Sequence, residues 1–402
     1  LQKNGCPVTY PYALEGFRPE FPNRLLFSPT NPLLVKVVRA WKAFMLKRVW
    51  TAAWAERVLK HFNVSVVAVD SHAPREWELE GRIVLAAERL RIGTVSLPHG
   101  PNVYLSLNPD DRGSDRPIRP VQVYREGDEN FESFKIFDAI VAATSLEAHL
   151  WRKQNFPGVE RIVKLGSARF CPEWMAVNES IAAVFRPAKG TSGKLKVVFF
   201  MPHWGESVDR PATLAAIERL TALPNVYLVV KEHTREGAGN LPEDGRKKYA
   251  LQDNTEVIQS ARSVKTGTWI RSGFRAGTAI REVDSASLAR WADLTIGFGS
   301  SVGLEPLCRG KLFIDPLYLY RHATMYQAMG VGLQVGSEEE LVETVRDLSP
   351  GDTRVPYATG KLDRLIIYGD REPHDVLATY VDLLESLSRG KGIPRRAGAV
   401  SR

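Results

Sequence analysis

The feature that most constrains the fold is a regular alternation between short β-branched runs and longer stretches with helical periodicity. Residues 64–70, VSVVAVD, form a continuous apolar run that ends in an acid, as expected for a strand buried on both faces. A helical stretch at 76–91 and a second apolar run at 94–100 complete a strand-helix-strand unit. Because such units build parallel sheets, the sequence predicts an α/β fold.

The alternation recurs along most of the chain. Further strands are predicted at 138–145, 161–170, 196–204, 226–233, 294–298 and 311–316. Helices are predicted within 34–62 and at 146–156, 212–222, 284–291, 302–309 and 373–388, with one more after the serine cap at Ser337. Residues 234–283 break the pattern and predict a long irregular insertion that is either functional or mobile.

The length of 402 residues exceeds one typical core and favours two domains. Composition shifts to VFRPAKGTSGK at 184–194, where Pro, Gly, Ser and Thr gather as in a linker. We therefore expect a first domain over 1–185, a second over 186–370, and a final segment over 371–402. This segment contains the last amphipathic helix, which could pack across to the first domain, and a basic tail.

Composition excludes several classes of protein. No apolar run reaches the roughly 18 residues that a bilayer crossing needs. The net charge is +8, but Lys and Arg are scattered and form no basic stripe interleaved with aromatics, which argues against nucleic-acid binding. Cys6, Cys171 and Cys308 lie far apart, so we expect no disulfide framework and no zinc site, and a reducing compartment. The chain begins with Leu1, so we expect the natural start to lie upstream.

Polar side chains repeatedly follow the predicted strands. In open parallel sheets, ligands collect beyond the carboxyl ends of the strands, so these positions are the candidate binding residues. Those that follow a predicted strand are Asp70, His72, His99, Arg169, His203, Lys231, His233, Gly299, Ser300 and Ser301.

The most informative stretch is ADLTIGFGSSVGLEPLCRGK, residues 292–311. Gly297 and Gly299 would let backbone approach a ligand closely, and Ser300 or Ser301 would cap a helix whose free N–H groups suit a diphosphate. Glu305 lies about one turn into that helix. It could accept hydrogen bonds from ribose hydroxyls, or it could simply balance the helix dipole.

The order Trp291, Asp293, double serine, Glu305 and Gly310-Lys311 resembles the C-terminal domain of GT-B glycosyltransferases, particularly the bacterial type that builds capsule and other surface polysaccharides. The resemblance extends to VSLPHGPN, VKLGSARFCPEW and PLYLYRHATMYQ, and covers about residues 60–350. The chain departs from the family at Lys231-Glu232-His233-Thr234, where Lys-x-His-Pro is common, and at Pro306, which predicts a tight or irregular first helical turn.

The resemblance implies two Rossmann-like domains facing across a cleft, with the acceptor on the first and a nucleotide sugar on the second. Helix N–H groups, Ser300, Ser301, Lys231 and Arg169 would stabilise the departing nucleotide without a metal or other cofactor. His99 would be the base for an inverting transfer, with Asp70 as the second choice.

Structural alternatives accompany each of these roles. His99 could be a neutral histidine that packs the turn, His203 and His233 could be turn residues instead of ligand contacts, and Arg169 could form a salt bridge. Trp204 could stack on a base or sugar ring, since it follows His203 at a strand end.

The leading hypothesis is a cytoplasmic glycosyltransferase that extends a lipid-linked or glycan acceptor at the inner face of the membrane, to which it would bind peripherally. A sugar-nucleotide 2-epimerase or a glycerophosphotransferase of the same fold is the second, and a non-catalytic module that binds a glycan or a partner is the third. The sugar, the nucleotide, the acceptor and the stereochemistry stay open.

Overall fold

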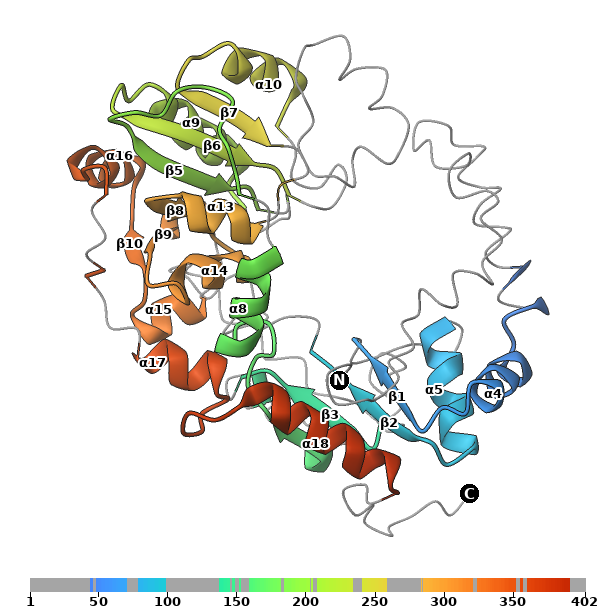
Figure 1. Cartoon of the computed structure of the whole chain (residues 1–402). Coiled ribbons are helices and arrows are strands. Elements are labelled where there is room, and N and C mark those ends of the chain that lie inside the picture. The colour runs from blue at the N-terminus through green and yellow to red at the C-terminus, as the bar shows by residue number, and fades with distance from the viewer. Residues whose placement is uncertain are drawn as a thin grey trace, which may run out of the picture. The chain divides into compact units, whose positions relative to one another are not determined.

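A computed structural model of the chain describes residues 44–45, 48–70, 79–98, 137–144, 147–148, 152, 159–181, 184–202, 204, 208–233, 241–258, 283, 285–320, 324–351, 355–356 and 360–390. Contacts divide these residues into two compact units (Figure 1). The first holds the described residues up to Pro98, those of 137–174, and 364–390; the second holds those of 175–363. The chain leaves the first unit within helix α8 (Pro172–Ile181) and returns within a π-helix (Asp363–Ile367).

The first unit is built on a parallel sheet with the strand order β1-β2-β3-β4. Its strands are β1 (Val66–Val69), β2 (Gly93–Ser96), β3 (Ala139–Ala142) and β4 (Ile162–Lys164), the last preceded by a 3₁₀ turn (Val159–Arg161). Helices α4 (Ala52–His61) and α5 (Leu79–Arg89) pack on one face through a cluster that includes Leu59, Val84 and Ile140. Thr51 caps α4 by accepting a hydrogen bond from the Trp54 N–H.

The opposite face of this sheet is covered by the last helix, α18 (Val376–Ser388). Leu387, Leu383 and Tyr380 pack against Val95 and other inward residues of β2, β3 and β4. The prediction that the C-terminal helix returns to the first sheet is therefore confirmed. Without α18, a parallel sheet made of short apolar strands would expose one face to water.

Two glycines hold the returning chain close to the loop after β4. Gly166 has φ +86, and a Cβ there would lie 2.1 Å from the Ile367 carbonyl oxygen. Gly369 has φ +61, and its Cβ would lie 2.7 Å from the Gly166 nitrogen. The Ser167 N–H donates to the Ile367 carbonyl (3.0 Å), and the Tyr380 hydroxyl donates to the Gly166 carbonyl (2.9 Å). The Gly-Ser pair of VKLGSARF thus has a structural role.

The second unit is built on a six-stranded parallel sheet with the order β10-β9-β8-β5-β6-β7. Its strands are β5 (Leu195–Phe200), β6 (Val226–Lys231), β7 (Thr255–Ile258), β8 (Leu294–Ile296), β9 (Leu312–Pro316) and β10 (Leu333–Val335). Its helices are α9 (Arg210–Thr221), α10 (Glu243–Ala250), α13 (Ser285–Trp291), α14 (Leu304–Leu307), α15 (Met325–Met329), α16 (Glu338–Asp347) and α17 (Gly360–Leu362), with 3₁₀ turns at Ser301–Gly303 and Leu317–Leu319.

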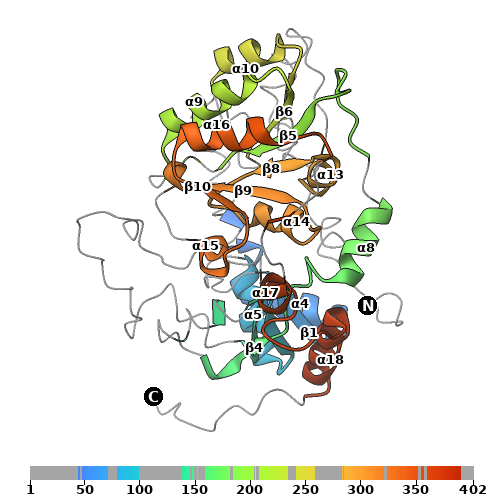
Figure 2. The ribbon, with the colours of Figure 1, turned by 90° about the vertical axis from the view of Figure 1, so that its left-hand side faces the viewer.

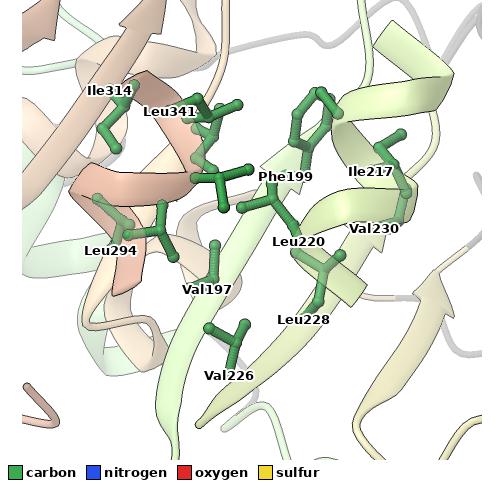
Figure 3. Close-up of a cluster of buried hydrophobic side chains, with 14 of the residues drawn as sticks. Val197, Phe199, Ile217, Leu220, Val226, Leu228, Val230, Leu294, Ile314 and Leu341 are labelled. Atoms are coloured by element: carbon green, nitrogen blue, oxygen red, sulfur yellow. The ribbon is translucent and has the colours of Figure 1, made fainter. Parts of the chain in front are cut away.

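Both faces of this sheet are buried because each strand contributes apolar residues to either side. Val197 and Phe199 point into a cluster with α9 and α16, where Leu220 and Leu341 meet them (Figure 3). Figure 2 shows α9 and α16 side by side on this face. On the other face, Val198 and its neighbours pack against α13. This two-sided burial confirms the prediction of parallel α/β units.

Several elements differ from the prediction. The described part of the expected irregular insertion, 241–258, contains α10 and β7, so that prediction is wrong there. The expected strand at 161–170 ends at Lys164, because Gly166 turns the chain. Helices α8 and α15 and strand β10 were not predicted, and the stretch 184–194 lies within the second unit, downstream of the crossing in α8.

Two further predictions have a definite outcome. Ser337 caps α16 as expected, since its side chain accepts a hydrogen bond from the Glu340 N–H at 3.1 Å. Among the described residues, none of the helices combines the length and the apolar character that a membrane crossing requires.

Candidate functional site

The strand order of the second unit contains one reversal, and it lies between β5 and β8. Strands β6 and β7 follow on one side of β5, whereas β8, β9 and β10 follow on its other side. In doubly wound sheets, ligands bind at the carboxyl ends of the strands at such a switch point. The residues that follow β5, β6 and β8 are therefore the candidate site.

The structure brings several of the predicted residues to this edge. Lys231 is the last residue of β6 and pairs in register with Phe200, the last residue of β5. Trp204 follows β5, His233 follows β6, and Gly299, Ser300 and Ser301 follow β8. Because β8, β5 and β6 are neighbours in the sheet, these side chains share one edge. His203 lies outside the described residues.

The glycines of the loop after β8 serve packing as well as backbone conformation. Gly299 has φ +59, and a Cβ there would lie 2.8 Å from the ring of Tyr320. A Cβ on Gly303 would lie 2.6 Å from the ring of Phe313. Sequence reasoning assigned Gly299 to close approach of a ligand, whereas in the structure an aromatic ring fills the position of its missing side chain.

The serines begin a short and tight turn. The Ser300 side chain accepts a hydrogen bond from the Val302 N–H at 3.4 Å, and residues 301–303 form a 3₁₀ turn that continues into the four residues of α14. Pro306 lacks an N–H and disfavours a regular helix here, so the expected irregular first turn is confirmed.

Glu305 is buried, with an exposed fraction of 5%, and it has a cationic partner that the sequence did not suggest. The Glu305 Oε2 lies 3.9 Å from the Arg309 Nη2. Arg309 is itself held by an ion pair with Glu179 of α8, and its Nη2 lies 3.8 Å from the Met175 Sδ. The ribose role of Glu305 and its dipole role both stay predictions.

The closing Gly-Lys of the stretch 292–311 is structural. Gly310 adopts φ +62 after α14. The Lys311 Nζ donates to the carbonyls of Arg290 and Ala292, the latter at 2.7 Å, and so caps the carboxyl end of α13. Burial is the main cause that lowers the pKa of Lys311.

Glu232, which sequence analysis read only as a departure from the family pattern, is an anchor at the end of β6. Its exposed fraction is 1%, and its Oε1 accepts hydrogen bonds from the Leu241 N–H (2.9 Å) and the Arg246 Nε (2.6 Å). Burial raises the pKa of Glu232, and Arg246 opposes that shift. The carboxylate thus ties the approach to α10 to the strand that carries Lys231. The sequence signal that could have identified Glu232 is its position between Lys231 and His233 at the end of a predicted strand.

Trp204 already has one stacking partner within the chain. The guanidinium carbon of Arg210, the first residue of α9, lies 5.2 Å from the Trp204 ring centroid. The indole also packs against the main core cluster of the second unit. Stacking of Trp204 on a ligand ring stays a prediction.

The structure describes two of the predicted site residues of the first unit, Asp70 and Arg169. Asp70 follows β1 and Arg169 follows β4; both are exposed. Since β2 and β3 separate these strands, the two strand ends are about 14 Å apart. The Arg169 guanidinium lies 5.2 Å from the centroid of the adjacent Phe170 ring. His99 lies outside the described residues.

Sequence analysis missed a buried acid in the first unit. Glu147 is 3% exposed; its Oε2 accepts a hydrogen bond from the Ala143 N–H (2.9 Å), and its own N–H donates to the Thr144 hydroxyl (3.0 Å). Burial raises the pKa of Glu147 to about 7, against the opposing effect of the Ala143 and Thr144 N–H groups. The sequence TSLE, a Ser/Thr-x-x-Glu capping box, was the signal that could have found it.

Metal-ligand candidates do not cluster in the part of the chain that the structure describes: no group of three or more His, Cys, Asp or Glu residues there could hold a metal ion. Cys171 is buried and its Sγ donates to the Ala168 carbonyl, and burial raises the pKa of this thiol to about 12.

Comparison with known proteins gives distant likenesses to solved structures. Neither a protein-family model nor a curated protein matches the chain. Among solved structures, a glycosyltransferase from Rickettsia africae aligns with a TM-score of 0.45 and 12% identity, over 90% of this chain and 83% of the other. A UDP-N-acetylglucosamine 2-epimerase from Rickettsia bellii aligns with a TM-score of 0.44 and 13% identity, over 95% and 89%.

The wall teichoic acid polymerase TagF aligns with a TM-score of 0.44 and 13% identity, over 81% of this chain and 72% of the other. These scores are all low. The assignment of the fold rests on the strand order and register given above.

Proposed function

We propose that this chain is a metal-independent glycosyltransferase of the GT-B type, which moves a sugar from a nucleotide sugar to a glycan or lipid-linked acceptor in bacterial surface polysaccharide biosynthesis. One observation carries the proposal. The ends of β5, β6 and β8 meet at the switch point of a doubly wound sheet, and they present Trp204, Lys231 and the Gly299–Ser301 loop there.

The residues at this edge suit the chemistry of a departing nucleotide. Lys231 supplies a positive charge, and the turn after Ser300 starts at this edge with its N–H end, where the Val302 N–H donates to the Ser300 side chain. Fixed donors of this kind stabilise negative charge that develops on a leaving phosphate. A nearby aromatic such as Trp204 offers a surface for a base or a sugar ring.

The proton of the acceptor hydroxyl requires a base, which we assign to His99, with Asp70 as the second choice. An unperturbed imidazole titrates near neutrality and can therefore accept a proton at physiological pH. In the retaining alternative, the leaving phosphate would take that proton itself, and His99→Ala would then retain turnover. We place the reaction at the inner face of the membrane, where the lipid-linked acceptor would lie.

The test is calorimetric titration of the full chain with UDP, GDP, CDP and CMP. We expect one of these nucleotides to bind, and Lys231→Met to weaken it by about 10- to 100-fold, since a hydrogen bond to a charged group is lost. The matched control is Lys248→Met, which removes a lysine from α10, away from this edge. If none of the four nucleotides bound, the proposal would be wrong.

A second arm separates the transferase from an epimerase. The chain is incubated, without any acceptor, with a nucleotide sugar that carries the nucleotide found to bind. If the chain is a transferase, the donor sugar should stay unchanged even at a high concentration of enzyme. Conversion of the donor to its 2-epimer would show that the chain is an epimerase and would overturn the proposed activity.

A further inference from the structure

Between Gly299 and Gly303, the loop after β8 has one apolar side chain that packs against a core cluster, that of Val302. Between Gly299 and Gly303, the Ser300 hydroxyl makes one long hydrogen bond of 3.4 Å, and the 3₁₀ turn has only three residues. A loop of this kind needs contacts from other elements to hold one conformation, because glycine leaves the backbone free to adopt many. Phe313 of β9, and Tyr320 and Tyr326 from the segment after it, provide those contacts; Phe313 lies beside Gly303, as described above.

The first contact is made by Tyr320. Its ring occupies the space beside Gly299 where a side chain would lie. Tyr320 forms an isolated antiparallel bridge with Val208, and the Asp209 N–H donates to the Leu319 carbonyl at 3.0 Å. The connection from β5 to α9 and the segment after β9 are thereby joined around the loop that follows β8.

The second contact is a single hydrogen bond that fixes one peptide plane. The hydroxyl of Tyr326, a fully buried residue of α15, donates to the Ser300 carbonyl oxygen at 2.8 Å. In a trans peptide the carbonyl and the following N–H point in opposite directions. Holding the Ser300 carbonyl toward Tyr326 therefore directs the Ser301 N–H to the other side of the loop.

Tyr326 itself is held by a buried polar anchor. Helix α15 has five residues, too few to be stable alone, and its cap is Thr324. The Thr324 hydroxyl donates to the Asp315 Oδ2 at the end of β9 (3.1 Å), and the Thr324 N–H donates to the Gln327 Oε1 (3.1 Å). Thr324 and Asp315 are both fully buried, and the rings of Phe313 and Tyr326 meet edge to face at 5.1 Å. Loss of this anchor would free Tyr326 to move.

We propose that Tyr326 is a positioning residue for the diphosphate of the nucleotide sugar, and that it acts through the Ser300–Ser301 peptide. The inference rests on the proposed function, because it needs a phosphate-bearing ligand at this loop. The Asp315–Thr324 hydrogen bond acts indirectly on the same peptide, because it holds helix α15 and therefore Tyr326 in place.

The experiment compares Tyr326→Phe with the unchanged chain by calorimetric titration. Probes are UDP, GDP and CDP, each paired with its own nucleoside, so that the contribution of the phosphates is measured separately from that of the base. We expect Tyr326→Phe to reduce the affinity for the diphosphate by about 3- to 10-fold, the range for one neutral hydrogen bond, with the nucleoside affinity unchanged. General loosening of the unit would weaken both ligands equally.

Tyr249→Phe is the matched control. It removes the hydroxyl of another buried tyrosine of the same unit, on α10, and should leave both affinities unchanged. Thr324→Val, which keeps the shape and removes the donor to Asp315, should reproduce a smaller loss for the diphosphate, and Thr324→Ser should restore it. These two variants still test the inference if Tyr326→Phe fails to fold.

The outcomes separate the inference from the proposed function. If the unchanged chain binds no nucleoside diphosphate, both are overturned. If it binds one and Tyr326→Phe binds it equally well, or loses nucleoside and diphosphate affinity in parallel, the proposed function stands and the positioning role of Tyr326 is overturned.

Discussion

The two units begin their central strands with the same device. Asp138 precedes β3 and Asp293 precedes β8. The Asp138 Oδ2 accepts from the Thr94 N–H on the neighbouring β2 (3.0 Å), as the Asp293 Oδ2 accepts from the Lys196 N–H on β5 (2.9 Å). In both units the aspartate N–H also donates back to the carbonyl of its partner residue. The reciprocal pair fixes which residues of two strands start side by side, and hence the register of each sheet.

Beyond this shared device the units differ in how they complete their cores. The second unit buries both faces of six strands with helices drawn from its own sequence, and its main cluster is rich in Leu, Ile, Val and Phe. In its described residues, the first unit has four strands, a cluster with many alanines, and one face that is covered by α18. The comparison shows that the first unit depends on a distant segment, whereas the second is largely self-sufficient.

The largest effect is expected where that distant segment meets the first unit. Gly166→Ala would place a Cβ 2.1 Å from the Ile367 carbonyl in a backbone conformation with φ +86. We expect a loss of about 4 kcal/mol or more in the stability of the first unit, because neither backbone segment can move away cheaply. Hydrogen exchange of peptides from β1–β4, compared with peptides from β5–β10, measures the two units separately.

Gly390→Ala is the control for that change. Gly390 also has a positive φ, +67, but nothing lies within 4 Å of the added Cβ, so we expect a loss of about 1 kcal/mol. Equal losses at the two glycines, or faster exchange in both units after Gly166→Ala, would contradict the dependence of the first unit on the returning chain.

The next effect concerns the buried acid of the first unit and depends on pH. Because burial raises the pKa of Glu147 from 4.5 to about 7, the folded state binds this proton more tightly than the unfolded state does. The resulting stabilisation is fully present below about pH 4.5 and is lost as the pH rises through about 7. Glu147→Gln resembles the protonated acid at every pH, so it should be more stable than the unchanged chain at pH 8, by up to about 3 kcal/mol.

Urea unfolding at pH 4.5 and at pH 8 checks this sign. The difference between Glu147→Gln and the unchanged chain should grow with pH, whereas Glu343→Gln, at an exposed position of α16, should show no such growth. A Glu147→Gln variant that is less stable at pH 8 would show that the ionised carboxylate is the stabilising form.

The smallest effect tests the shared device directly. The Asp138 carboxylate accepts hydrogen bonds from both the Thr94 N–H and the Thr94 hydroxyl (3.2 Å). Asp138→Ala therefore leaves two buried donors of Thr94 without this acceptor. Asp293→Ala leaves the Lys196 N–H without that acceptor and also removes a partly exposed ion pair between the Asp293 Oδ1 and the Lys196 Nζ (3.9 Å). We expect losses of about 2–3 and about 1–2 kcal/mol in the respective units. In a double-mutant cycle, Thr94→Val should bring the cost of Asp138→Ala down to that of Asp293→Ala. An unchanged cost would mean that the threonine hydroxyl contributes nothing to the device.

Much of the fold follows from local patterns. Runs such as 64–70 and 226–233 predicted strands, and β1 and β6 lie within them. The expected burial of 64–70 on both faces is wrong, because β1 lies at the edge of its sheet and Ala68 is exposed. The serine before the acidic turn predicted the cap of α16, and Pro306 predicted the irregular turn before α14. These features depend on the chemistry of a few adjacent residues, so they could be predicted without knowledge of the fold.

Apart from α8, which has ten residues, and α10, which has eight, the missed elements are short. Strands β7 and β10 have four and three residues, and α15 has five. Helices of that length are not stable in isolation, so local sequence carries little trace of them. Helix α15 exists because Thr324 reaches Asp315 and Tyr326 reaches Ser300, and α10 is held by the carboxylate of Glu232. The residues of the candidate site could be named from their positions after predicted strands. The contact between Gly299 and the ring of Tyr320 could not be predicted, because it joins two segments that local patterns do not relate.

The sequence by itself determined that this chain forms parallel α/β units, with polar residues at the ends of buried strands, because periodicity and capping act over a few residues. Only the tertiary structure decided the order of the six strands, the return of α18 to the first sheet and the support of the Gly299–Ser301 loop by Tyr320 and Tyr326. Those features join segments far apart along the chain, and their stability comes from packing that exists only when the whole unit is assembled.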